Sequence, residues 1–235
     1  MPNKPKKPNY DPIAIMKELI DSIVLVYSDS VSTASPPSLR QIADEFDLNP
    51  LKVRKLLITA GVYQSDIADY VMRLYHEKKR VAEIMTLTGL SKASVNSYLP
   101  YTKIPYKMEE ISVTAERCRK FRERRTAVER MKQSVDNSVL WDTLLLFQSY
   151  PFYTTKGLKF TYTIKGGEMF VSRKDKSITR ATVDLAFQKA LSLEGIISGP
   201  KKLGGVGASY LYPVFIRIGV IKPSADEQKR ADTDS

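Results

Sequence analysis

The chain has 235 residues, a length that allows two domains and exceeds that of a single DNA-binding module. Its formal net charge of +11 favours a polyanionic partner, either nucleic acid or an anionic membrane surface. The single cysteine, Cys118, excludes an internal disulfide and a cysteine-rich zinc site, and no stretch approaches the roughly 18 apolar residues of a membrane span. We therefore expect a cytoplasmic, nucleoid-associated protein with no membrane contact, no cofactor and no metal.

The first residues form a basic segment that precedes the first predicted helix. Residues 1–9, MPNKPKKPN, combine three prolines with three lysines, which predicts a disordered basic arm or a solubilising tail. Asp11 can cap a helix that has Pro12 at its first position and apolar residues at helical spacing up to Tyr27. Residues 28–38 are expected to form a flexible loop.

Two later segments share one pattern at an offset of 42 residues. In the first, residues 38–57, Ile42 and Val53 belong to an apolar stripe, and Asn49 followed by Pro50 predicts the start of a helix. In the second, residues 80–99, Gly89 supplies a tight turn and Ser91 is a natural N-cap. Each segment therefore predicts two short helices joined by a turn, with Asp47 standing in the first copy where the second has Gly89.

A leading helix is expected before each pair. Ser65 or Asp66 can cap the second of these, which would end near the basic run Lys78 to Arg80. This gives two compact three-helix units, residues 10–62 and 63–111. Residues on the outer face of each second helix are candidates for reading base edges: Asn49, Leu51, Arg54, Lys55, Ser91, Lys92, Ala93, Asn96 and Ser97.

Residues 38–103 resemble the tandem helix-turn-helix modules of bacterial and phage regulators and, more loosely, the bipartite DNA-binding regions of transposases and sigma-type factors. The resemblance implies binding to double-stranded DNA and covers about a third of the chain. If both second helices entered successive major grooves, they would lie ~34 Å apart, and the site would hold two short elements about one helical turn apart.

A basic helix is predicted at residues 112–133, where Cys118, Phe121, Val128 and Met131 form a narrow apolar stripe. It is either a solvated linker helix or an element that follows the DNA backbone. In the second case its basic residues position the protein without reading sequence. The candidate phosphate ligands of the whole chain are Lys52, Arg80, Lys103, Arg117, Arg119, Lys120, Arg122, Arg124, Arg125, Lys201 and Lys202.

Residues 134–221 predict a small α+β domain. An apolar helix at 135–149 carries the only tryptophan, a hairpin turns at Gly166 and Gly167, and a helix capped by Ser177 or Thr179 runs to about Leu193. The glycine-rich loop 199–207 either shapes a mobile surface or binds a phosphate through its free N–H groups. The spacing of apolar residues does not distinguish a helix from a strand at residues 209–221. Residues 222–235 are expected to be a disordered tail.

The predicted fold is therefore mainly α with a small α+β C-terminal domain. The predicted function is sequence-specific binding of double-stranded DNA by a bacterial, phage or mobile-element transcriptional regulator that is not an enzyme. One alternative is an autoregulating protein whose residues 134–221 bind a protein partner, as in some anti-CRISPR proteins or adaptors. A recombinase or transposase component is less favoured, because the chain has one histidine and the acidic residues within 134–221 have no spacing typical of a metal cluster. The pattern does not indicate an oligomeric state.

Overall fold

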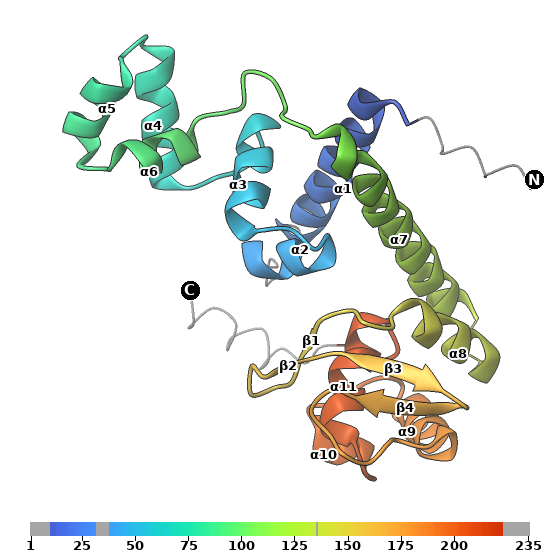
Figure 1. Ribbon diagram of the computed structural model, residues 1–235. Coiled ribbons are helices and arrows are strands. Elements are labelled where there is room, and N and C mark those ends of the chain that lie inside the picture. The colour runs from blue at the N-terminus through green and yellow to red at the C-terminus, as the bar shows by residue number, and fades with distance from the viewer. Residues whose placement is uncertain (1–9, 32–37, 135, 223–235) are drawn as a thin grey trace, which may run out of the picture. The chain divides into compact units, whose positions relative to one another are not determined.

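The computed structural model describes residues 10–31, 38–134 and 136–222. This part of the chain is mainly helical, with eleven helices and two small β-hairpins near the C-terminus (Figure 1). The chain divides into two compact units, Met1–Arg119 and Lys120–Ser235, and the boundary falls within a long helix. The expected N-terminal arm and most of the expected C-terminal tail lie outside the described residues.

The first unit begins with helices α1 (Pro12–Val31), α2 (Leu39–Glu45) and α3 (Pro50–Thr59), which contact one another. The predicted cap of α1 is confirmed, because Asp11 accepts a hydrogen bond from the Ile13 N–H at 2.9 Å. Apolar side chains from all three helices are fully buried, including Ile23, Ile42 and Leu56. Helix α1 also includes residues 28–31, which were expected in a loop, whereas the rest of that loop up to residue 37 is outside the described residues.

Three further helices follow: α4 (Asp66–His76), α5 (Val81–Thr88) and α6 (Lys92–Tyr98). Their mutual contacts enclose a small separate core of Val71, Leu74, Ile84, Val95 and Leu99. Of the two predicted cap residues, Ser65 and Asp66, Ser65 is the N-cap of α4, since its hydroxyl accepts the Ala68 N–H at 3.2 Å.

The 42-residue repeat is visible in the way α2 and α5 begin. Ser38 precedes α2 and Arg80 precedes α5, and each donates its backbone N–H to the side chain three residues later. Gln41 accepts this bond at 2.8 Å in the first copy, and Glu83 accepts it at 2.7 Å in the second. The equivalent residues thus satisfy equivalent backbone donors at the two helix starts.

The turns and caps that follow these helices also correspond. Asp47 has φ +50° and Gly89 has φ +71°, so both copies use a left-handed residue at the same point of the repeat. Asn49 and Ser91 then cap α3 and α6 by accepting backbone N–H groups at 2.8 and 3.2 Å. The predicted caps are confirmed, and Asp47 and Gly89 share a positive φ.

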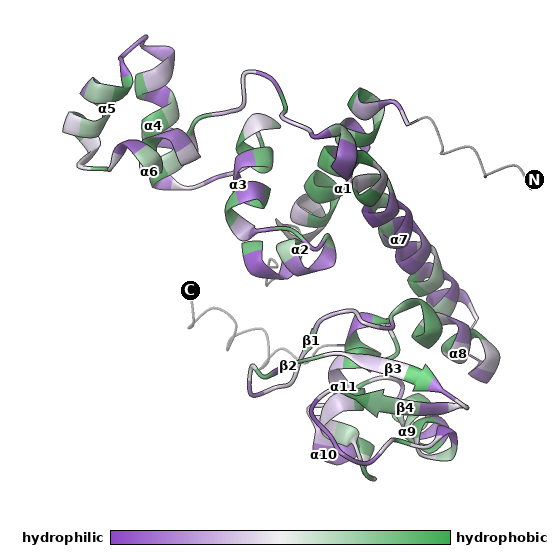
Figure 2. Cartoon of the chain, in the orientation of Figure 1, coloured by the Kyte–Doolittle hydropathy of each residue, from purple (hydrophilic) through white to green (hydrophobic). Residues whose placement is uncertain are grey.

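Helix α7 (Met108–Gln133) is polar over most of its surface and buries one narrow stripe (Figure 2). Cys118, Phe121 and Met131 of the predicted stripe are buried, and Val128 is partly buried. The helix starts four residues earlier than expected, so Ile111 joins this stripe as a further buried residue. Burial of the stripe accounts for a stable helix despite its high charge.

The second unit contains α8 (Asn137–Leu146), α9 (Arg180–Ser192), α10 (Pro200–Leu203) and α11 (Ala208–Arg217) around two antiparallel hairpins. The hairpins pair β1 (Phe152–Tyr153) with β2 (Lys159–Phe160) and β3 (Tyr162–Lys165) with β4 (Glu168–Val171). The core is rich in aromatic side chains, and the fully buried ones are Phe147, Phe160, Tyr162, Phe187, Tyr212 and Phe215. Burial raises the pKa of Tyr162, whose hydroxyl donates to the Leu144 carbonyl at 2.8 Å.

Three features of this unit go beyond the sequence prediction. The predicted β3–β4 hairpin is confirmed, and Thr179 is the one of the two predicted cap residues that caps α9. The short β1–β2 pair was not expected. Residues 209–221, for which the sequence left helix and strand open, are helical up to Arg217 as part of α11, although Pro213 lies inside that helix. The glycine-rich loop is interrupted by α10, which contains Lys201 and Lys202.

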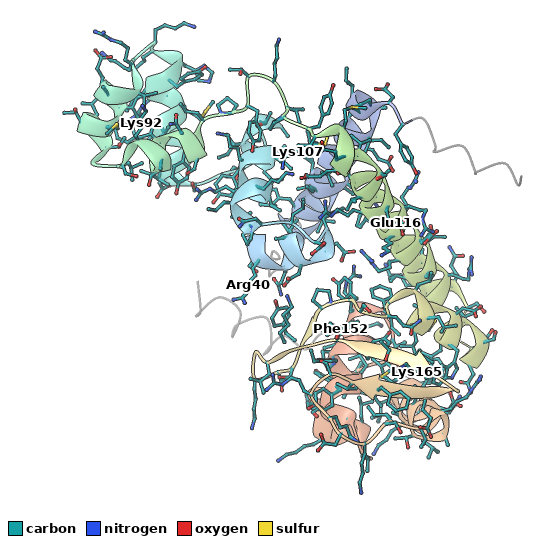
Figure 3. All side chains as sticks on the ribbon, viewed as in Figure 1. Arg40, Lys92, Lys107, Glu116, Phe152 and Lys165 are labelled. Atoms are coloured by element: carbon teal, nitrogen blue, oxygen red, sulfur yellow. The ribbon has the colours of Figure 1, made fainter. Side chains whose placement is uncertain are left out.

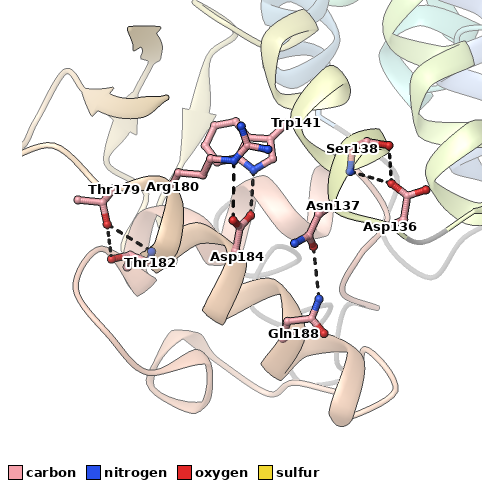
Figure 4. Close-up of polar contacts among 9 residues, drawn as sticks. All are labelled: Asp136, Asn137, Ser138, Trp141, Thr179, Arg180, Thr182, Asp184 and Gln188. Atoms are coloured by element: carbon pink, nitrogen blue, oxygen red, sulfur yellow. Dashed lines mark hydrogen bonds and ion pairs between the residues drawn. The ribbon is translucent and has the colours of Figure 1, made fainter. Parts of the chain in front are cut away.

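Trp141 joins α8 to α9 through a polar contact at the edge of this core (Figure 4). Its indole N–H donates to Asp184 at 2.9 Å, and the Arg180 guanidinium lies 4.8 Å from the centre of the Trp141 ring. Since Trp141 is buried, Asp184→Ala would leave the indole donor without this acceptor. We expect the change to lower the free energy of unfolding by about 1 to 2 kcal/mol in urea denaturation followed by tryptophan fluorescence.

Two variants provide the controls for this prediction. Asp184→Asn retains a side-chain oxygen that can accept the indole proton, so it should cost less than the alanine variant. Asp142→Ala removes an exposed carboxylate from the same helix as Trp141 and should have little effect. Equal losses in the three variants would contradict the role given to Asp184.

Candidate nucleic-acid interface

The first turns of α3 and α6 present side chains to solvent at equivalent points of the repeat. Asn49 and Leu51 are exposed at the start of α3, and Leu51 is 61% exposed despite being apolar. Ser91, Lys92 and Ala93 are exposed at the start of α6, where Figure 3 labels Lys92. These positions remain accessible to an external partner.

Arg54, in the middle of α3, lies against α6 and is half-buried. Its guanidinium donates to the Ser97 hydroxyl at 2.7 Å and to the Tyr98 hydroxyl at 3.2 Å. The guanidinium carbon also lies 4.2 Å from the centre of the Tyr98 ring, within the range of a cation–π contact. Two predicted base readers, Arg54 and Ser97, are therefore bonded to each other in this structure.

Lys55 makes the neighbouring contact between the same two helices. Its ammonium donates to the Asn96 carbonyl at 2.6 Å and lies 4.7 Å from the centre of the Tyr101 ring. Burial lowers the pKa of Lys55, because the charged form loses contact with water. The side chain of Asn96 is exposed, so only its carbonyl is part of this contact.

The candidate phosphate ligands on the first part of α7 are partly engaged with acidic side chains. Arg117 lies 3.4 Å from the Asp47 carboxylate, and Arg119 donates twice to Glu116 at 2.7 Å. Lys120, Arg122 and Arg125 on the second part of the helix are exposed. Surface pairs of this kind are weak, so they leave Arg119 able to exchange partners.

Arg124 differs from the other basic residues of α7, because it is 8% exposed. Its guanidinium lies 5.2 Å from the Tyr150 ring centre and 5.9 Å from that of Phe147. Arg217 of α11 contacts the same rings and donates to the Tyr150 hydroxyl at 3.1 Å. The predicted phosphate ligand Arg124 thus faces the aromatic core of the second unit.

The remaining candidate phosphate ligands are scattered over both units. Arg80 and Lys103 are exposed in the first unit, whereas Lys52 is half-buried. Lys201 and Lys202 are exposed on α10, and the left-handed residues Gly204 and Gly205 follow that helix. Residues 10–31, 38–134 and 136–222 contain no helix long and apolar enough to cross a membrane, and no group of three potential metal-binding side chains.

Thr59 and Tyr101 were not among the predicted site residues, although both belong to the contact between α3 and the end of α6. The Tyr101 N–H donates to the Thr59 hydroxyl at 3.0 Å. The two residues are separated by 42 positions, so they are equivalent in the repeat, but this equivalence alone does not predict that they touch. No known protein family, curated protein or solved structure matches the chain.

Proposed function

We propose that the chain binds double-stranded DNA sequence-specifically through two helix-turn-helix units, α2–α3 and α5–α6, and acts as a transcriptional regulator of bacterial, phage or mobile-element origin. One observation carries the proposal: α3 and α6 begin alike, each with exposed side chains after a left-handed turn. The second helix of a helix-turn-helix contacts base edges through its N-terminal residues.

The side chains at these starts have chemistry suited to base edges and phosphates. Lys92 can donate to guanine or to a phosphate, and the exposed Asn96 one turn later can pair with adenine through its amide. Leu51 and Ala93 offer apolar contact to a thymine methyl group. The net charge of +11 supports the same partner, since basic residues provide the sequence-independent part of DNA affinity.

Selection of bound fragments from random double-stranded DNA with the full chain tests this proposal. We expect a defined sequence motif, and specific binding tighter than binding to random DNA by at least about a thousandfold at physiological salt. Asn96→Ala should relax the preference at one base pair while leaving random-sequence binding unchanged. Fragments without any shared motif, or the absence of bound DNA, would contradict the proposed function.

A further inference from the structure

The hydrogen bonds between α3 and α6 are reciprocal: each of two neighbouring residues on α3 bonds to the residue of α6 that is equivalent to the other. In the 42-residue repeat, Arg54 is equivalent to Asn96 and Lys55 is equivalent to Ser97. Arg54 bonds to Ser97, whereas Lys55 bonds to Asn96, so each residue contacts the equivalent of its neighbour. Such an exchange of partners is the property of two copies related by a twofold axis.

Thr59 and Tyr101 provide a second, independent sign of this symmetry. They are equivalent residues of the repeat, and they bond directly to each other at 3.0 Å. Equivalent residues meet in this way when they lie beside a twofold axis. The middle and end of α3 therefore form a junction with the end of α6 and the residues just after it. We define this junction by Arg54, Lys55, Thr59, Asn96, Ser97, Tyr98 and Tyr101.

The junction limits the distance between the exposed helix starts. The bond between Arg54 and Ser97 spans at most one extended arginine side chain, and Leu51 and Ala93 lie about one helical turn earlier on their helices. The Cα atoms of Leu51 and Ala93 are therefore less than about 25 Å apart. Two second helices that enter successive major grooves must be ~34 Å apart. The junction therefore holds α3 and α6 too close together for the spacing expected from the sequence.

We propose, on the basis of the proposed function, that α3 and α6 form one composite reading surface for a continuous DNA element of at most about seven base pairs. Arg54 and Lys55 are positioning residues that hold α6 against α3 instead of contacting bases. The residues facing DNA are those of the two helix starts, Asn49, Leu51, Ser91, Lys92 and Ala93, together with the exposed side chain of Asn96 one turn along α6. The two copies of the repeat thus form one DNA-binding surface instead of two separate ones.

A cross-link across the junction tests this inference. The bond between Thr59 and Tyr101 brings these residues within reach of a disulfide, so Thr59→Cys and Tyr101→Cys are introduced together in the full chain. Cys118 stays in place because it is buried. The pair is closed by oxidation or by a short bismaleimide, and affinity for the selected DNA is measured before and after reduction. Tyr101→Cys alone controls for loss of the ring beside Lys55.

The composite surface predicts that the cross-link closes within one chain and that the cross-linked protein binds selected DNA within about twofold of the reduced protein. The selected motif should be one uninterrupted element. A cross-link that fails to close, or one that weakens binding at least about tenfold until reduction restores it, overturns the inference. Two motif elements one helical turn apart would also overturn it. Absence of selected DNA despite a closed cross-link would refute the proposed function and the reading surface, while the junction itself would stand.

Discussion

Replacing Gly195 by alanine is expected to lower the free energy of unfolding of the second unit by about 3 kcal/mol or more. Gly195 is buried after α9 with φ +72°, and a Cβ atom there would lie 2.8 Å from the Val220 carbonyl oxygen. That oxygen belongs to the backbone, which cannot rotate away. Gly195 also accepts the Lys222 N–H at 3.0 Å, so a shift of the chain would disturb this bond. Urea denaturation followed by Trp141 fluorescence measures the loss.

Gly157→Ala is the matched control for this prediction. Gly157 has φ +74°, but a Cβ atom there would meet no atom within 4 Å. The control therefore carries the left-handed strain without the steric clash and should cost about 1 kcal/mol. If both variants lost the same stability, contact with the Val220 carbonyl would not be the cause of the larger effect.

The local features of the first unit could be predicted because each depends on neighbouring residues. Asn49 and Ser91 cap helices through bonds to the next turn, and Gly89 adopts a conformation that its lack of a Cβ permits. These causes act within a few residues and therefore appear in the sequence pattern. The similar starts of α3 and α6 could be predicted for the same reason, because each depends on a cap and a turn within a few residues.

The junction could not be predicted, because its partners are about 40 residues apart and depend on how two three-helix groups meet. Arg54 and Lys55 have the helical spacing and positive charge that predict a DNA contact, and the sequence contains no sign that α6 partly covers them. Arg124 illustrates the same limit in the second unit. Its neighbours on α7 are charged, whereas the rings that cover it come from residues 147 and 150.

The smaller elements of the second unit escaped prediction for a different reason. Strands β1 and β2 contain two residues each, too few for an alternating pattern. In α11, Pro213 argues locally against a helix, but burial of Leu211, Tyr212, Val214 and Phe215 outweighs that preference. Tertiary packing, which a single sequence does not display, decides both cases.

Introducing negative charge at both helix starts, through Leu51→Glu with Lys92→Glu, is expected to weaken binding of the selected DNA at least about a hundredfold at low salt. Both positions are exposed and lie in the first turn of a helix, where a carboxylate is favourable to the helix dipole. The thermal midpoint should therefore stay near that of the parent chain while DNA affinity falls.

Lys165→Glu with Leu185→Glu makes the same two exchanges at exposed positions of the second unit and changes the net charge equally. Figure 3 labels Lys165 on the β3–β4 hairpin. Any loss in this control reports only the general effect of charge on DNA affinity, so the excess loss in the first pair measures direct proximity to DNA. That excess should shrink as salt rises, because repulsion between the new carboxylates and phosphates is screened. Equal affinities for the two pairs, measured by fluorescence anisotropy at two salt concentrations, would place the starts of α3 and α6 away from the bound duplex.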